Sequence, residues 1–104
     1  MITNIKTTEE FRALIESNET VFVDFWAEWC GPCKYMGPIL SAFAEANPSV
    51  TVAKVDVDEN QELSEAYGIR SIPTIAVFQK DLTPVKTIIG AVPLSTLDSA
   101  LKAL

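Results

Sequence analysis

The stretch DFWAEWCGPCKYMGP, residues 24–38, contains both cysteines and both tryptophans of the 104-residue chain. The preceding residues, TVFVDF (20–25), are mostly β-branched or aromatic and predict a buried strand. The following residues, GPCKYMGPILSAFAEAN (31–47), predict a helix with Pro32 near its start, where proline is tolerated. The two cysteines are therefore predicted to lie where a buried strand passes into a helix.

The rest of the chain continues this alternation of strands and helices. Strands are predicted at 3–6, 50–57, 74–79 and 85–90, and helices at 7–17, 60–68 and 93–104. Thr7 and Glu10 have capping-box spacing at the first helix start. The order β-α-β-α-β-α-β-β-α, in one domain of residues 1–104, indicates an α/β fold with a central mixed five-stranded sheet flanked by four helices.

Charge and composition exclude several classes of partner. The chain has 8 basic and 14 acidic residues, a net charge of −6, and no cluster of Lys or Arg. Nucleic acids and anionic membranes both favour positive charge, so neither is an expected partner. No segment reaches the roughly 20 apolar residues of a membrane helix, and the first residues lack the apolar core of a secretory signal. We therefore expect a cytoplasmic protein, and we also expect it to be a monomer.

Two uses of the cysteine pair other than redox chemistry are weakly supported. A structural zinc site takes four Cys or His ligands, whereas this chain has two cysteines and no histidine. A site shared between two chains would supply four thiolates, and CGPC alone does not exclude it. A structural disulfide closing a loop of about four residues would contribute only about 2 kcal/mol. Such staples are typical of secreted, cysteine-rich domains.

A redox pair accounts for more of the pattern. Unpaired backbone N–H groups and the helix dipole favour an anion at a helix start, so Cys30 is predicted to be an exposed, reactive thiolate. Gly31 allows close approach of a partner, and Pro32 removes one N–H and fixes one φ angle. Cys33, one turn later, is placed to attack a mixed disulfide formed at Cys30. A CxxC pair in a strand–helix–strand pattern favours dithiol–disulfide exchange.

Asp24 is an acidic residue within the apolar strand that leads to the cysteines. An unpaired buried carboxylate is costly, so burial should raise its pKa. We interpret Asp24 as an acid/base group beneath Cys33 that takes and returns its proton, the alternative being an open, solvated strand end. Lys54, in VTVAKVDV (50–57), either pairs with Asp24 from the next strand or reaches water at a strand end.

A second signal lies in RSIPTIAVF (70–78), where Pro73 directly precedes a predicted strand. Taken alone, this proline indicates only that a strand starts after it. Beside a redox pair, a cis Ile72–Pro73 bond would hold a loop near the sulfurs, with backbone groups open to an extended peptide. Trp29, next to Cys30, is expected to be an exposed aromatic anchor for a partner.

Motifs along essentially the whole chain resemble the thioredoxin family. They are VDFWAEWCGPCK (23–34), a proline later in the same helix, VAKVDVDEN (52–60), YGIRSIPT (67–74) and a glycine before the last helix. The resemblance implies a thioredoxin fold and a protein-disulfide reductase. In it, Cys30 is the attacking thiol, Cys33 the resolving thiol, and no cofactor is needed beyond this pair.

The resemblance also assigns further site residues and partners. Asp24 corresponds to the family's buried acid, Lys54 to its lysine neighbour and Pro73 to its cis-proline. The substrate-facing rim corresponds to Trp29, Ile72, Gly90 and Ala91. The implied partners are disulfide-containing target proteins and an NADPH-dependent thioredoxin reductase.

The chain departs from the family pattern at three places. The hairpin QKDLTPVK (79–86) lacks the usual glycine and looks one residue longer, Ser71 stands where glycine is common, and Val92 and Pro93 follow the rim glycine. We expect the last two to affect partner choice. Gly-Pro between the cysteines is typical of reducing members, but an oxidant and a non-enzymatic binding module of the same fold remain alternatives.

Overall fold

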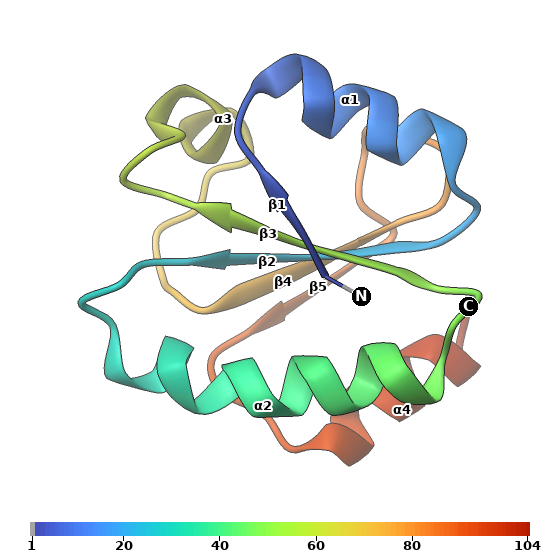
Figure 1. Cartoon of the computed structure of the whole chain (residues 1–104). Helices are drawn as coiled ribbons and strands as arrows, with labels where there is room; N and C mark the ends of the chain where they lie inside the picture. Colours follow the sequence, from blue (N-terminus) through green and yellow to red (C-terminus); the bar gives the residue numbers. More distant parts are fainter. Residues whose placement is uncertain (1) are drawn as a thin grey trace.

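The computed structural model describes residues 2–104, whose strands and helices alternate along the chain (Figure 1). The strands are β1 (Ile2–Ile5), β2 (Val21–Trp26), β3 (Thr51–Asp56), β4 (Thr74–Phe78) and β5 (Lys86–Ile89). The helices are α1 (Thr8–Ser17), α2 (Gly31–Ala46), α3 (Gln61–Ala66) and α4 (Leu94–Lys102). The predicted order of elements is confirmed, and their ends differ from the predictions by one or two residues, as helix and strand ends usually do.

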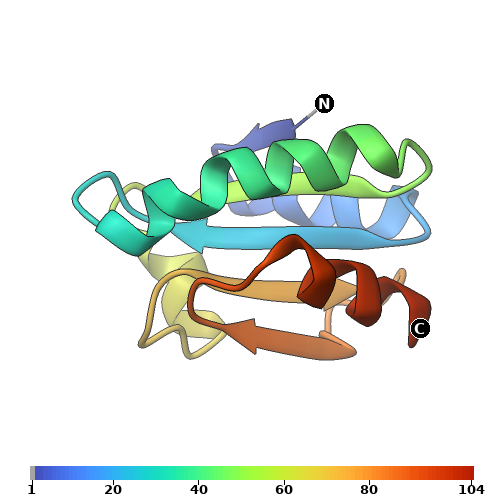
Figure 2. The same ribbon diagram turned by 90° about the horizontal axis from the view of Figure 1, so that it is seen from below.

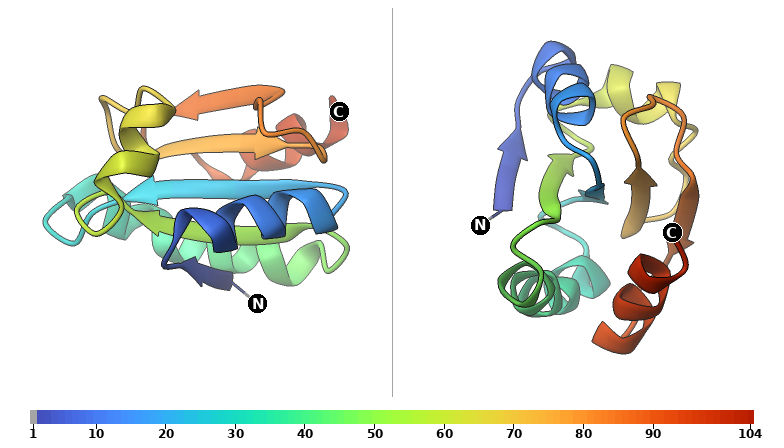
Figure 3. Two further views of the ribbon diagram at one scale, coloured as in Figure 1. Left: turned by 90° about the horizontal axis from the view of Figure 1, so that it is seen from above. Right: turned by 90° about the vertical axis from the view of Figure 1, so that its right-hand side faces the viewer.

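The five strands form one mixed sheet in the order β1-β3-β2-β4-β5. β3 runs parallel to both β1 and β2, whereas β4 runs antiparallel to β2 and β5. Helices α2 and α4 lie side by side across one face (Figure 2), and α1 and α3 cover the other (Figure 3). Because β2 is central and covered on both faces, its side chains are buried whichever way they point.

The core is divided by the sheet into two apolar layers. Val23 and Phe25 of β2 belong to the layer that also contains Phe11 of α1. Phe22, on the alternate face of β2, belongs to the layer beneath α2 and packs on Phe43 with ring centroids 4.8 Å apart. Burial of each such ring contributes about 2–3 kcal/mol. These layers hold β2 and α2, and therefore the residues between them, in fixed positions.

The start of α1 shows a modified capping box. The Thr7 hydroxyl oxygen accepts the Glu10 N–H at 3.1 Å, as the spacing predicts. The Glu10 carboxylate accepts the N–H of Lys6 at 3.4 Å, one residue earlier than in a standard box.

None of the helices within residues 2–104 has the length and hydropathy needed to cross a membrane.

Candidate active site

The first site residue, Cys30, is the N-cap of α2. Its backbone N–H donates to the Ala27 carbonyl at 3.2 Å, which closes the turn after β2. Its Sγ accepts the backbone N–H of Cys33 at 3.1 Å, so the sulfur satisfies an N–H that the helix itself leaves unpaired. An N–H donor and the positive end of the helix dipole both stabilise negative charge on this sulfur.

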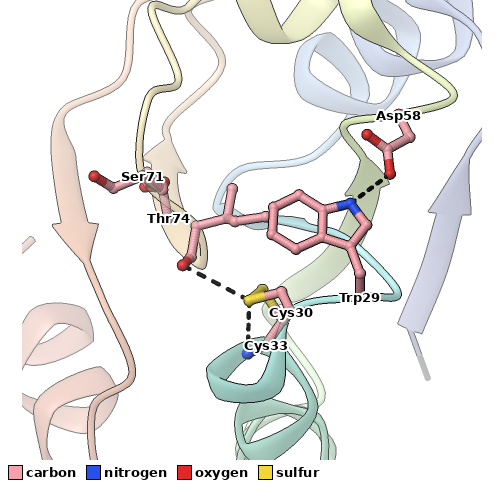
Figure 4. The surroundings of a disulfide bond; sticks show 7 residues. Trp29, Cys30, Cys33, Asp58, Ser71 and Thr74 are labelled. Carbon is pink, nitrogen blue, oxygen red and sulfur yellow. Dashed lines mark hydrogen bonds between the residues drawn. A yellow bond between two sulfur atoms is a disulfide. The ribbon is translucent and has the colours of Figure 1, made fainter.

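The two cysteines form a disulfide with their Cα atoms 5.2 Å apart (Figure 4). Both are buried: 5% of Cys30 and 2% of Cys33 is exposed. The prediction that Cys30 is exposed was therefore wrong, because only a small part of its surface is accessible. Ile72 packs against the pair, and its carbonyl oxygen lies 3.7 Å from Cys30 Sγ. A loop distant in sequence thus packs against the disulfide.

The first turn of α2 leaves its outer side open. Gly31 and Pro32 are both exposed. A Cβ atom at Gly31 would meet no heavy atom within 4 Å, so this backbone is accessible to an approaching chain. Pro32 occupies the first turn, where its missing N–H removes no helical hydrogen bond.

The Ile72–Pro73 peptide bond is cis, as we expected beside a redox pair. The Pro73 carbonyl accepts the N–H of Gly90 at 2.8 Å, which joins this loop to the one following β5. Gly90 has a φ of 93°, a conformation that side-chain-bearing residues rarely adopt. Ala91 follows and is exposed. Two segments of the predicted rim are therefore bonded to each other.

Trp29 is strongly exposed, with 70% of its surface accessible. Its indole N–H donates to the Asp58 carboxylate at 2.8 Å, which fixes the ring direction beside the disulfide (Figure 4). Asp58 follows β3 and was not singled out from the sequence. Several acidic residues follow one another in VDVDEN (55–60), and nothing in that run indicates which carboxylate meets the indole.

Asp24 is fully buried, and neither of its carboxylate oxygens has a hydrogen-bond partner within residues 2–104. Its neighbour across β4 is Ile75, which belongs to the apolar layer beneath α2. Asp24 therefore lies on the sheet face that α2 covers, which excludes the solvated alternative. Burial raises the pKa of its carboxyl to about 7, although the Lys54 charge acts to lower it.

Lys54 is beside Asp24 in the parallel register of β2 and β3, the position that the first of its two alternatives required. The hydrogen-bonded ion pair is nevertheless absent, because both Asp24 oxygens are unpaired in the described residues. The Lys54 ammonium instead lies 4.3 Å from the ring centroid of Trp26, a cation–π contact. Both residues line a surface cavity of about 480 Å³, together with the charged side chains of Lys6, Glu28, Asp56 and Glu59. Lys54 thus acts on Asp24 through its charge only.

Ser71, one of the departures from the family pattern, is exposed beside the cis-proline loop. Its carbonyl accepts the hydroxyl of buried Thr74 at 2.5 Å. Within residues 2–104, no group of three or more Cys, His, Asp or Glu side chains is placed to hold a metal ion.

Comparison with known proteins identifies the family. The family model described as Thioredoxin matches residues 2–103, nearly the whole chain. The chain belongs to the thioredoxin family. A thioredoxin of Alicyclobacillus acidocaldarius is 49% identical over 96 residues, which cover 91% of this chain and 90% of that protein. A thioredoxin of Porphyra purpurea is 46% identical over 97 residues, with 91% and 90% covered.

Solved structures agree with this assignment. Mitochondrial thioredoxin 3 of Saccharomyces cerevisiae, in its oxidised form, has a TM-score of 0.89 and 38% identity, over 99% of this chain and 95% of that one. A mutant thioredoxin of Halobacterium salinarum has a TM-score of 0.92 and 33% identity, over 98% of this chain and 88% of that one. The predicted thioredoxin fold is confirmed. Thioredoxins are protein-disulfide oxidoreductases that need no cofactor, and this chain carries out dithiol–disulfide exchange through the Cys30–Cys33 pair.

Proposed function

We propose that the chain is a general protein-disulfide reductase in which Cys30 attacks and Cys33 resolves. The observation that carries these roles is the N-cap position of Cys30, whose Sγ accepts the Cys33 N–H at 3.1 Å. That N–H and the helix dipole stabilise a thiolate at Cys30. Cys33 is the less exposed of the two, so an incoming disulfide meets Cys30 first.

The reaction then proceeds in two exchanges. The Cys30 thiolate attacks one sulfur of the target disulfide, which breaks that S–S bond and releases the other target sulfur as a thiolate. The Cys33 thiol gives its proton to the Asp24 carboxylate and attacks Cys30 Sγ. The mixed disulfide breaks, the second target sulfur leaves, and the Cys30–Cys33 disulfide forms. The target gains two electrons and two protons, the second proton coming from Asp24 and the first from solvent.

Asp24 suits this proton transfer because its carboxyl has a pKa of about 7. A base with a pKa near the working pH both accepts and returns a proton readily. Lys54, through its charge, and the Gly31–Pro32 dipeptide tune the pair. Trp29, Ile72, Pro73, Gly90 and Ala91 form the surface that binds the target peptide.

The proposal includes the recycling partner and the setting. A thioredoxin reductase returns two electrons to the disulfide, and we propose that NADPH supplies them. One relative, from Mycobacterium leprae, is named a bifunctional thioredoxin reductase/thioredoxin, which supports such a pairing. We further propose a monomer with a single domain of residues 1–104 that functions in the cytoplasm, where thiols are kept reduced.

Reduction of insulin by dithiothreitol tests the proposal, because reduced insulin chains precipitate and scatter light. The wild type should accelerate precipitation, and Cys30→Ser should abolish the acceleration, since the attacking thiolate is lost. Cys33→Ser should accumulate mixed disulfides with target proteins in non-reducing gels. Undiminished acceleration by Cys30→Ser, or failure of Cys33→Ser to trap any target, contradicts the assigned roles. Equilibration with a glutathione buffer distinguishes a reductant from an oxidant.

A further inference from the structure

The loop between β5 and α4 is held by two hydrogen bonds on either side of Ala91. The Gly90 N–H donates to the Pro73 carbonyl at 2.8 Å. The Val92 N–H donates to the thioether Sδ of Met36 at 3.3 Å. No hydrogen bond in the described part of the chain uses the backbone of Ala91 itself. Its N–H and C=O groups are therefore free, on an exposed residue between two fixed neighbours.

Met36 reaches this loop from the helix that carries the cysteines. It follows Cys33 by three residues in α2, close to one helical turn, so both side chains lie on the same side of the helix. Met36 is fully buried in the apolar layer that also holds the Val92 side chain. An aliphatic side chain would fill this space equally well, but only the thioether offers an acceptor, though a weak one.

We propose that Met36 is a positioning residue for target binding: its thioether holds the Val92 N–H and thereby fixes the Gly90–Pro93 loop relative to Cys30. This inference rests on the proposed reductase function, and in particular on Ala91 as part of the target-binding surface. Met36 ties the loop to α2, and Gly90 ties the same loop to Pro73. The attacking sulfur and the two peptide-binding segments are then held as one unit.

The Met36–Val92 contact should strengthen target binding, because it orders the Gly90–Pro93 loop in advance. A loop that is already fixed loses little conformational freedom when an extended peptide bonds to its backbone. Without the sulfur acceptor, that ordering would accompany target binding and weaken it. The chemistry at Cys30 would be unaffected once the target is bound. Removal of the acceptor should therefore raise KM for a protein disulfide and leave kcat nearly unchanged.

The sequence permits an unusually selective test, because Met1 and Met36 are its only methionines. Expression with norleucine in place of methionine substitutes CH₂ for the sulfur and keeps the shape of the side chain. Expression with selenomethionine keeps a chalcogen acceptor. The norleucine and selenomethionine proteins thus differ at Met36 in the ability to accept the Val92 N–H.

The first readout is amide hydrogen exchange of the oxidised protein by NMR. In the norleucine protein the Val92 amide should exchange about three- to tenfold faster, the ratio expected for loss of one modest hydrogen bond. The selenomethionine protein should resemble the wild type. The Thr51 amide, which bonds to the Thr20 carbonyl at the far end of the sheet, is the internal reference. Equal Val92 exchange in all three proteins overturns the proposal.

The second readout is kinetic. KM for insulin, with dithiothreitol as reductant, should rise about two- to fivefold in the norleucine protein, and kcat should change less than that. Reduction of oxidised glutathione, which is too small to lie along the loop, should be unaffected. A Met36→Leu variant should behave like the norleucine protein and provides a second, genetically encoded case. Faster Val92 exchange without a change in KM overturns the role in target binding.

A matched control isolates Met1. Met36→Leu expressed with methionine and with norleucine differs only at Met1, and these two proteins should be indistinguishable. Failure of the proposed function is recognised separately. A wild type that does not reduce insulin contradicts that function, whereas the Val92 exchange rates still test the Met36 contact.

Discussion

Trp29 and Cys30 are neighbours in the chain but differ greatly in accessibility, since 70% of the tryptophan and 5% of the cysteine is exposed. The sulfur of Cys30 is thus mostly covered, and it lies beside a strongly exposed aromatic ring. Asp24, in contrast to Trp29, has no exposed surface, and its carboxylate has no hydrogen-bond partner in residues 2–104. Such a group is costly to keep charged, and its retention in the core favours a chemical role over a structural one.

The raised pKa of Asp24 predicts a specific pH dependence of stability. The carboxyl has a pKa of about 7 when folded and an ordinary value of 3.8. Between these values the folded protein holds a proton that the unfolded chain has released, so the free energy of unfolding decreases as pH rises. The stability that the protonated Asp24 carboxyl contributes is fully present below its ordinary pKa of 3.8 and is lost as pH rises through its folded pKa of about 7. Asp24→Ala abolishes it.

Urea unfolding of the oxidised protein measures this effect. The stability of Asp24→Ala relative to wild type should rise by up to about 4 kcal/mol between about pH 4 and about pH 8, since each pKa unit corresponds to about 1.4 kcal/mol. Ser95→Ala, which removes an exposed hydroxyl that does not titrate, is the control, and its curve should parallel the wild type. A parallel curve for Asp24→Ala would contradict the raised pKa.

At the scale of elements, α2 carries both cysteines and Met36 in its N-cap and first two turns. Its N-cap carries Cys30, its first turn carries Cys33, and the next turn presents Met36 to the loop after β5. The β4–β5 hairpin has its connecting loop at the opposite end of the sheet from the cysteines. Its loop adopts a φ of 64° at Lys80, in the hairpin where a glycine is usual in the family.

The conformation of Lys80 predicts a stabilising substitution. Left-handed φ angles cost a side-chain-bearing residue about 1–2 kcal/mol, and glycine avoids this penalty. Because glycine also gives the unfolded chain more freedom, Lys80→Gly should gain about 0.5–1 kcal/mol in unfolding free energy. Gln79→Gly is the matched control at an exposed neighbour without a positive φ, and it should lose stability. Loss of stability in both variants would contradict the expectation.

At the scale of the whole molecule, the sheet brings the site together. In register, Phe25 of β2 lies beside Thr74 of β4, which lies beside Ile89 of β5. The end of β2, the start of β4 and the end of β5 therefore meet at one end of the sheet. The segments that follow or precede them supply the disulfide, the cis-proline loop and the Gly90–Pro93 loop.

The oxidation state should change the stability of the whole domain. The Cys30–Cys33 bond closes a loop of about four residues, and the chain-entropy estimate for such a loop is about 2 kcal/mol. The reduced protein should thus unfold at lower urea concentration than the oxidised protein. The Cys30→Ser/Cys33→Ser variant should unfold identically with and without dithiothreitol. A reduced form as stable as the oxidised form would show that the chain-entropy estimate does not apply here.

The local features were predictable because they depend on neighbours in the chain. The β-branched run predicts β2, the proline and the helical pattern predict α2, and the two-residue spacing of the cysteines places both sulfurs on one helical turn. The burial of Asp24 followed from its position in an apolar strand. The cis peptide at Pro73 required the neighbouring redox pair and the family resemblance in addition.

Contacts between distant residues were not predictable in the same way. The Trp29 indole bonds to a carboxylate 29 residues away, and the Val92 N–H bonds to a thioether 56 residues away. The Lys54 ammonium lies on the Trp26 ring and leaves Asp24 unpaired, although the strand register places Lys54 beside Asp24. The chain's residue pattern thus specified the elements and their chemistry. The packing of the sheet, helices and loops determined which of several chemically similar groups each of these side chains contacts. The reason is that the lowest free energy depends on which groups the complete fold brings within reach.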